Sequence, residues 1–295
     1  NVTTIGAQSF KSNQLTELTI PESVKTIEAN AFALNPITSL TLTNVKSIGL
    51  GAFYDCDIQE LSLGNVETIG DFAFELNKLT ELEIPDSVET IGQQAFDSNS
   101  LSSVHLGNSV ETIGSWAFDE NSITSLVIPD SVISVGKSAF RMNQIESLHL
   151  GNSVETLGDF AFILNSVTDL TIPNSVTSIG QQAFDRNEIS SLTLGNSVET
   201  IGSWAFDENP FTEVTLPSSV TTLGTNAFGG ATLYCDDSSD EIKFECQCGG
   251  QPCAVGHTCM NAACKNLECN QETYRLEGCC HTESEFCNRC KIDLC

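Results

Sequence analysis

The amino-acid sequence predicts an α/β solenoid followed by a small cysteine-rich module. Two observations predict the solenoid: phenylalanine recurs every 21 or 22 residues, and an apolar segment with the spacing of a β-strand follows each of these phenylalanines. A third predicts the module, because 12 of the 13 cysteines lie at residues 235–295. We therefore divide the chain into a solenoid (1–234), an acidic linker (235–245) and a disulfide-stapled module (246–295).

Each repeat contains a strand segment, a turn and a return segment. The strand segment, such as Ile123–Ile128, alternates apolar and polar residues, and successive segments are expected to stack as a parallel sheet. Pro129 or Gly107 then turns the chain, a Ser-Val-x-Thr-Ile-Gly stretch brings apolar residues inward, and we expect a short helical or 3-10 turn ending in Ala-Phe. No repeat can bury its apolar side without its neighbours. The marker residues are Phe10, Phe32, Phe53, Phe74, Phe96, Phe118, Phe140, Phe162, Phe184, Phe206 and Phe228.

The repeat pattern x-Ser-Val-x-x-Ile-Gly-x-x-Ala-Phe-x-x-Asn-x-Leu-x-x-Leu-x-Ile-Pro resembles the BspA-like leucine-rich repeats of microbial surface proteins. The resemblance covers residues 2 to about 234. It implies a right-handed leucine-rich repeat coil, an extracellular or cell-surface location, and a use in adhesion and protein binding. It implies no chemistry, because a repeat fold does not by itself define a function.

The chain is strongly acidic, with a formal net charge of -27 from 39 acidic and 12 basic residues. This balance argues against nucleic acid as a partner, since phosphates are bound by Lys and Arg, and against acidic membrane surfaces. It favours solubility, cation binding or a basic partner. The sequence has no apolar run long enough to span a bilayer, so no membrane insertion is predicted.

The sequence carries no catalytic signature, and we predict neither an enzyme nor a cofactor. Its four histidines form no triad or metalloprotease motif, and the recurrent glycine is a single turn residue rather than a phosphate-binding loop. Carboxylates are numerous, but the repeat distributes them along the chain instead of gathering them in a pocket.

An asparagine precedes most strand segments, where its amide can bond the backbone of adjacent repeats, and we expect a structural role. Cys56 takes that place in its own repeat. Because no base is predicted beside it, we interpret Cys56 as a buried free thiol rather than a nucleophile. The row comprises Asn13, Asn35, Asn77, Asn99, Asn121, Asn143, Asn165, Asn187 and Asn209.

Four aromatic residues, each two positions before a marker phenylalanine, form the first candidate contact surface. They are spaced 44 residues apart, which at the spacing of β-strands places one ring about every 10 Å along one flank. Intervening repeats carry polar residues there, such as Gln94, so the position is expected to be partly exposed. The row either contacts a protein or glycan partner or packs against neighbouring turns. It consists of Phe72, Trp116, Phe160 and Trp204.

The outward side of the strand segments is the second candidate surface, because the resemblance to leucine-rich repeats implies partner binding there. The face is small, polar and acidic. His105 and His149 lie two repeats apart, about 10 Å, which is too far to share one metal ion, so no metal site is predicted. The binding candidates are Glu17, Glu60, Glu81, Glu83, His105 and His149.

The C-terminal segment has too few apolar residues for a core of its own, and its cysteines predict disulfides formed in an oxidising compartment. Cys287, Cys290 and His281 could imitate a zinc site, but the segment lacks paired Cys-x2-Cys modules. The acidic residues 236–241 could hold calcium, although they lack EF-hand spacing. The predicted disulfide residues are Cys235, Cys246, Cys248, Cys253, Cys259, Cys264, Cys269, Cys279, Cys280, Cys287, Cys290 and Cys295.

A longer period overlies the repeat: residues 91–121 recur at 179–209 with five changes, which indicates internal duplication. The first residues, 1–10, are the second half of a repeat without a cap, so we expect a preceding segment or another molecule to cover them. The Asn1-Val2-Thr3 sequon makes Asn1 a predicted glycosylation site if the source is eukaryotic.

Two functional hypotheses follow. The first is a non-enzymatic extracellular scaffold that binds a protein or glycan and serves cell-surface adhesion. The second is a structural subunit that assembles end to end into an extracellular fibre or filament, favoured by the uncapped start and by the duplicated surface.

Overall fold

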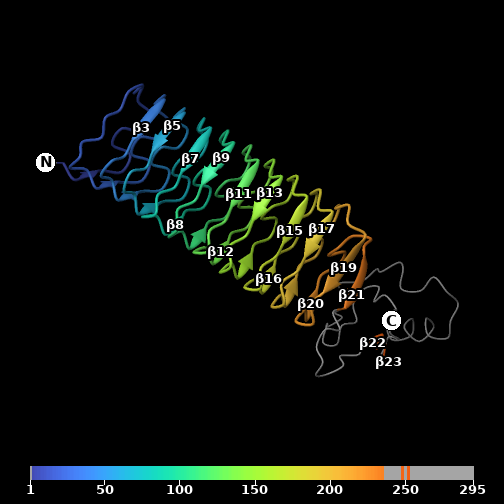
Figure 1. The fold of residues 1–295 in the computed structure, drawn as a ribbon. Helices are drawn as coiled ribbons and strands as arrows, with labels where there is room; N and C mark the ends of the chain where they lie inside the picture. Colours follow the sequence, from blue (N-terminus) through green and yellow to red (C-terminus); the bar gives the residue numbers. More distant parts are fainter. Residues whose placement is uncertain (1, 236–246, 249–250, 253–295) are drawn as a thin grey trace.

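The computed structural model of the chain describes residues 2–235, 247–248 and 251–252, and residues 2–235 wind into a parallel β-solenoid. Figure 1 shows the coils stacked in sequence order along one axis, from blue to orange. Each coil has three sides: a short strand in a continuous sheet, a turn around the marker phenylalanine, and a second strand. The described residues contain no helix, and therefore none that could cross a membrane.

One side of every coil belongs to an eleven-stranded parallel sheet. Each strand is a Thr or Ser followed by Ile, Val or Leu, and the second residue points into the core. Residues one repeat apart pair directly, as Thr90 does with Thr112. In pairing order the strands are β1 (Thr4–Ile5), β2 (Thr26–Ile27), β4 (Ser47–Ile48), β6 (Thr68–Ile69), β8 (Thr90–Ile91), β10 (Thr112–Ile113), β12 (Ser134–Val135), β14 (Thr156–Leu157), β16 (Ser178–Ile179), β18 (Thr200–Ile201) and β20 (Thr222–Leu223).

The predicted strand segments form the opposite side, in four shorter parallel ladders. Leu15–Ile20 is the exception: it forms no strand, and its Leu15 amide instead donates to the side chain of Asn35. A separate antiparallel pair joins β22 (Gln247–Cys248) and β23 (Gln251–Pro252). The ladder strands are β3 (Ser39–Thr41), β5 (Glu60–Ser62), β7 (Glu81–Glu83), β9 (Ser103–His105), β11 (Ser125–Val127), β13 (Ser147–His149), β15 (Asp169–Thr171), β17 (Ser191–Thr193), β19 (Glu213–Leu216) and β21 (Thr232–Cys235).

The core is organised by the marker phenylalanines, as the period predicts. Consecutive rings stack nearly parallel, with centroids 5.2 to 5.4 Å apart, from Phe10 to Phe228. The nine rings from Phe32 to Phe206 are at most 1% exposed. Replacing one of them by Ala should cost about 3–5 kcal/mol, because both neighbouring coils lose their packing partner.

The predicted helical or 3-10 turns are wrong: the third side is a non-helical turn with left-handed residues. In the coil of Phe74, Phe72 and Leu76 have φ of 59° and 56°. The amides of Phe72, Phe74 and Leu76 donate to carbonyls of the next coil, at 2.7, 2.8 and 3.0 Å. Alternate amides are therefore committed to the neighbouring coil, and a continuous right-handed helix cannot form.

From β4 to β20, the glycine that follows each short strand is required by close approach between coils. A Cβ on Gly114 would lie 2.6 Å from the carbonyl carbon of Gly92 in the preceding coil. Only a residue without a side chain allows the backbones to stack at this corner. This contact accounts for the Ile-Gly element of the repeat.

Candidate functional site

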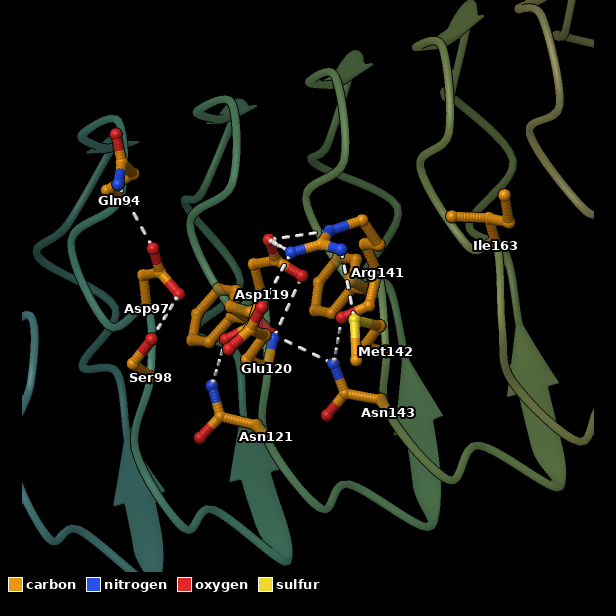
Figure 2. A network of polar contacts seen from close by, with 12 residues as sticks. Gln94, Asp97, Ser98, Asp119, Glu120, Asn121, Arg141, Met142, Asn143 and Ile163 are labelled. Atoms are coloured by element: carbon orange, nitrogen blue, oxygen red, sulfur yellow. Dashed lines mark hydrogen bonds and ion pairs between the residues drawn. The ribbon is translucent and has the colours of Figure 1, made fainter.

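The asparagine row joins consecutive coils, as predicted. The Asn143 side chain donates to the Phe118 carbonyl at 2.9 Å and accepts from the Ile123 amide at 3.0 Å. Seven further members of the row make the same two bonds, and Figure 2 shows Asn121 and Asn143 beside the turns that they hold. These eight residues are structural because both polar groups of each amide are used inside the stack, whereas Asn13 is exposed and donates to the Lys11 carbonyl at 3.4 Å.

Cys56 replaces the asparagine in its coil and is a buried free thiol, as predicted. Its Sγ lies 3.1 Å from the Phe32 carbonyl oxygen. Burial raises the pKa of the Cys56 thiol to about 11, so the reactive thiolate is scarce at neutral pH. The thiol is therefore a packing residue rather than a nucleophile.

We call the side of the solenoid that carries the turns the turn flank: in each coil it runs from two residues before the marker phenylalanine to two residues after it. Its first feature is the predicted aromatic row. Phe72, Trp116 and Phe160 are partly buried, and Trp204 is 37% exposed. All four have φ between 56° and 61°, a conformation that is uncommon for bulky residues. The fold thus holds large rings at positions where the backbone would favour Gly or Asn.

Lys137 was missed by the sequence prediction. Its ammonium lies 5.5 Å from the centroids of both Trp116 and Phe160, one on the preceding coil and one on the following coil. This arrangement is a double cation–π contact. The 22-residue period places Lys137 between the two rings, so the signal was present in the sequence.

A second row on the turn flank consists of the residues that directly follow the marker phenylalanines from Phe74 to Phe206, and five of them are carboxylates. Asp97 and Asp119 are 8% and 2% exposed. Gln94 donates to Asp97 Oδ2 at 3.0 Å and Ser98 donates to Oδ1 at 3.0 Å (Figure 2). We call this the carboxylate row. Its members are Glu75, Asp97, Asp119, Arg141, Ile163, Asp185 and Asp207.

Arg141 is the one basic member of the carboxylate row. Its Nε and Nη2 both lie 2.8 Å from Asp119 Oδ2, and Nη2 also lies 2.8 Å from Glu120 Oε1 (Figure 2). A guanidinium can bridge two carboxylates in this way because its donors are fixed in a planar fork. The bridge ties the coil of Arg141 to the preceding coil.

Burial changes the acidity of the row. It raises the pKa of Asp119 to about 6, although Arg141 acts in the opposite direction. Burial, with a smaller effect from the Asp97 charge, raises the pKa of Glu75 to about 7. Burial also raises the pKa of Asp97. These groups lie under the turns and not in a cavity, so we assign them no catalytic role.

The duplication provides a second version of this arrangement; we call residues 91–121 the first block and residues 179–209 the second block. Asp185, the counterpart of Asp97, is 3% exposed and accepts from Gln182 at 2.7 Å. Its Oδ1 has no hydrogen-bond partner among the described residues, where Arg186 stands in the place that Ser98 has in the first block.

The Arg186 side chain points to Glu208 instead, with Nε 3.2 Å from Oε2. The place of Arg141 in the following coil is taken by Gly229. The second block therefore holds its carboxylates without an internal bridging guanidinium.

The outward strand face is polar, as predicted, but it does not gather its candidate residues into one site. Val127, 60% exposed, separates His105 from His149 across the ladder. Glu83 pairs with His105, and Glu60 accepts from Ser39 at 3.3 Å. Glu81 is exposed on β7, and Glu17 is exposed outside any strand. Within the part of the chain that the structure describes, no three His, Cys, Asp or Glu residues are placed to hold a metal ion.

Two shallow grooves on the described residues lie away from the aromatic row and the carboxylate row. One, of about 770 Å³, is lined by polar residues of the corner between the two sheets, including Glu111, Asp130 and Glu155 around Ile133. The other, of about 430 Å³, lies between β17 and β21 and includes Tyr234. Neither groove includes a member of the aromatic row or a histidine, and neither gathers a catalytic constellation.

Several predicted features lie outside the described residues. These are the glycosylation site Asn1, the possible calcium site at 236–241, and the disulfide residues, of which only Cys235 and Cys248 have a described backbone. They stay predictions. The division of the chain at residue 235 stays a prediction as well.

Comparison with known proteins identifies the repeat. The family model described as BspA type leucine rich repeat region matches in six copies, over residues 3–124, 67–188 and 111–234. No curated protein matches the chain.

Solved structures share the fold at low sequence identity. A leucine-rich repeat protein from Bacteroides ovatus superposes with a TM-score of 0.62 at 21% identity, over 79% of this chain and 64% of that protein, so the chain spans less than two thirds of it. The pneumococcal vaccine antigen PcpA gives 0.52 at 18% identity, over 80% and 72%. A leucine rich cell surface protein from Faecalibacterium prausnitzii gives 0.50 at 22% identity, over 80% and 84%.

Proposed function

Because the chain belongs to the BspA-type leucine-rich repeat family, we propose that it is a non-catalytic extracellular scaffold that holds a protein or glycan partner along its turn flank. Two proteins of the same fold are described as a vaccine antigen and as a cell surface protein, which supports a location outside the cell. The high net negative charge favours a neutral or basic partner.

The aromatic row carries this proposal. Its rings sit on the third side of the coil, where three backbone bonds per turn, or two in the turn of Trp204, fix them to the next coil. Half-exposed aromatic rings on a rigid support supply contact area at low entropic cost, which is the property of binding surfaces for proteins and sugars. The same slot in other coils holds Gln94 or Gln182, so the fold does not require a ring there.

A double variant tests the aromatic row. Trp116→Ala with Trp204→Ala removes two rings, while Gln94→Ala with Gln182→Ala truncates the same slot in neighbouring coils as a matched control. The labelled full chain is applied to a glycan array and to immobilised surface proteins of candidate cells. We expect the tryptophan variant to lose binding at least tenfold and the glutamine control to retain it. Equal binding by all forms would mean that the rings pack against neighbouring turns and do not contact the partner.

End-to-end assembly is the second candidate. The observation that favours it is the duplication, because Trp116 and Trp204 present the same surface element twice along the rod. Electron microscopy and light scattering of the non-reduced protein across concentration test it. Regular fibres support assembly, and monodisperse particles at every concentration contradict it.

A further inference from the structure

The two blocks differ at the carboxylate pair that ends each of them. Asp119 and Glu120 receive the Arg141 guanidinium from the following coil. The corresponding pair in the second block is Asp207 and Glu208. Among the described residues, no basic side chain forms an ion pair with Asp207.

We infer that the pair formed by Asp207 and Glu208 binds an arginine side chain of a protein partner, in the place that Arg141 fills in the first block. The inference rests on the proposed binding function and names the chemistry of one part of the partner. The first block is the template, since an almost identical coil already binds a guanidinium with this residue pair.

The coil that follows the second block cannot supply the cation from the position of Arg141. Gly229 stands there with φ of 55°, and a Cβ on it would lie 2.7 Å from Asp207 Oδ1. Both the backbone conformation and the available space therefore exclude a side chain. Gly230, the next residue, has no described atom within 4 Å of the position that its own Cβ would take.

The neighbouring carboxylate is also under-compensated. Asp185 is buried, and its Oδ1 lacks a hydrogen-bond partner. Burial raises the pKa of Asp185, the Gln182 hydrogen bond and the Arg186 charge lower it, and the charges of Asp207 and Glu208 raise it. A guanidinium on the pair would lower the negative potential that acts on this buried group.

The geometry favours arginine over a metal ion or lysine. The described residues contain no three-ligand metal cluster. Arg141 uses two nitrogens on one carboxylate and shares one of them with the adjacent carboxylate, which a single ammonium cannot reproduce. Arg186 already contacts Glu208, but both side chains are more than half exposed, and such a pair is weak enough to be shared.

Nuclear magnetic resonance of the full chain, titrated with N-acetyl-L-arginine amide at constant ionic strength, tests the inference. We expect saturable shifts of the Gly229 and Gly230 amide signals and little change at Glu120 and Asn121, where Arg141 occupies the equivalent pair. Asp207→Asn should weaken binding roughly tenfold or more, because it removes charge-assisted hydrogen bonds.

Arg186→Ser should change the affinity for the arginine probe in the opposite direction. It makes the second block resemble the first, removes a competing cation and should tighten binding several-fold. Equal shifts with N-acetyl-L-lysine amide, or binding unaffected by Asp207→Asn, would overturn the inference. The proposed function is tested separately, by the binding of the tryptophan double variant. A failure of this inference can therefore be distinguished from a failure of the proposed function.

Discussion

Residues 91–121 and 179–209 are nearly the same sequence placed in two electrostatic settings. In the first block, every carboxylate oxygen of Asp97 and Asp119 has a hydrogen-bond donor. In the second block, Asp185 keeps the glutamine contact of its counterpart but has an unpaired Oδ1. The two blocks thus differ in the state of a buried carboxylate, in part because Arg186 stands in the place of Ser98.

The neighbouring coils account for much of the difference. The first block follows a coil with Glu75 in the carboxylate row and precedes one with Arg141, whereas the second block lies between Ile163 and Gly229. In a solenoid each residue contacts its equivalents one repeat before and one repeat after. An internal duplication therefore copies the packing of a coil but not its electrostatics.

Removing Arg141 should have the largest effect on this comparison. Arg141→Ala leaves Asp119 buried without its cation, and we expect a loss of about 3 kcal/mol in unfolding free energy. The matched change in the second block, Arg186→Ala, breaks an exposed pair and should cost less than about 1 kcal/mol. Urea unfolding, with hydrogen exchange at the Phe118 and Phe140 amides to localise the loss, measures both.

A double variant separates the charge from the packing of Arg141. Asp119→Asn in the Arg141→Ala background removes the unpaired charge and should recover about 1–2 kcal/mol. If Arg141→Ala and Arg186→Ala cost the same, or if Asp119→Asn gives no recovery, the bridge contributes little to the stack.

The packing was predictable from the sequence because it is periodic. The spacing of Phe96, Phe118 and Phe140 indicated the stack of rings, and the position of Asn121 before its strand indicated the bond between coils. The turn was not predictable from local composition, since Gln-Gln-Ala-Phe is compatible with a helix. Backbone bonds to the next coil, formed by residues such as Trp116, decide the conformation instead, and they become visible only once the coils are stacked.

The site was predictable in part. The aromatic row followed from the 44-residue spacing, and its partial exposure is confirmed for Trp116 and Trp204. The carboxylate row has the same 22-residue signal, but the prediction singled out neither Asp97 nor Asp119, and acidic residues rarely lie inside a protein. Which side chains turn inward depends on the left-handed residues of the turn, which composition does not reveal.

The pH dependence of the first block is the next test. Glu75 has a pKa raised to about 7 from 4.5, so the folded chain holds this proton to higher pH than the unfolded chain. Stability from this group is therefore complete below pH 4.5 and is lost as pH rises towards 7.

Glu75→Ile places an isoleucine in the coil before the first block, as Ile163 stands in the coil before the second block. Between pH 4.5 and 7.5 we expect the variant to lose less stability than the natural chain, by on the order of 1 kcal/mol once solvent screening of this partly exposed carboxyl is included. The reverse change, Ile163→Glu, should add a similar dependence. If thermal unfolding gives parallel pH profiles for all three proteins, the pH dependence of stability does not come from Glu75.

The hydroxyl of Ser98 offers a smaller test, because it is the group that the second block lacks. Ser98→Ala removes the 3.0 Å hydrogen bond to Asp97 Oδ1 and makes this carboxylate resemble Asp185. We expect a loss of about 0.5–1.5 kcal/mol and an upward change in the pKa of Asp97. Carboxyl carbon resonances followed through a pH titration measure the pKa, and an unchanged titration would show that the hydroxyl does not matter.

Lys137 should give the smallest effect, and it bears on the aromatic row in the two blocks. Trp116 has the Lys137 ammonium 5.5 Å from its ring, whereas the coil after Trp204 has Thr225 at the corresponding place. Lys137→Gln copies the residue found two repeats away on either side, Gln93 and Gln181, and should cost about 0.5 kcal/mol, as expected for an exposed cation–π contact. In a Trp204→Phe background, it should also make Trp116 fluorescence easier to quench with acrylamide. The same substitution in a Trp116→Phe background should leave Trp204 unchanged, because no cation of the described residues lies over the ring in the second block. A change there would mean that Lys137 acts through the stack rather than through its own two rings.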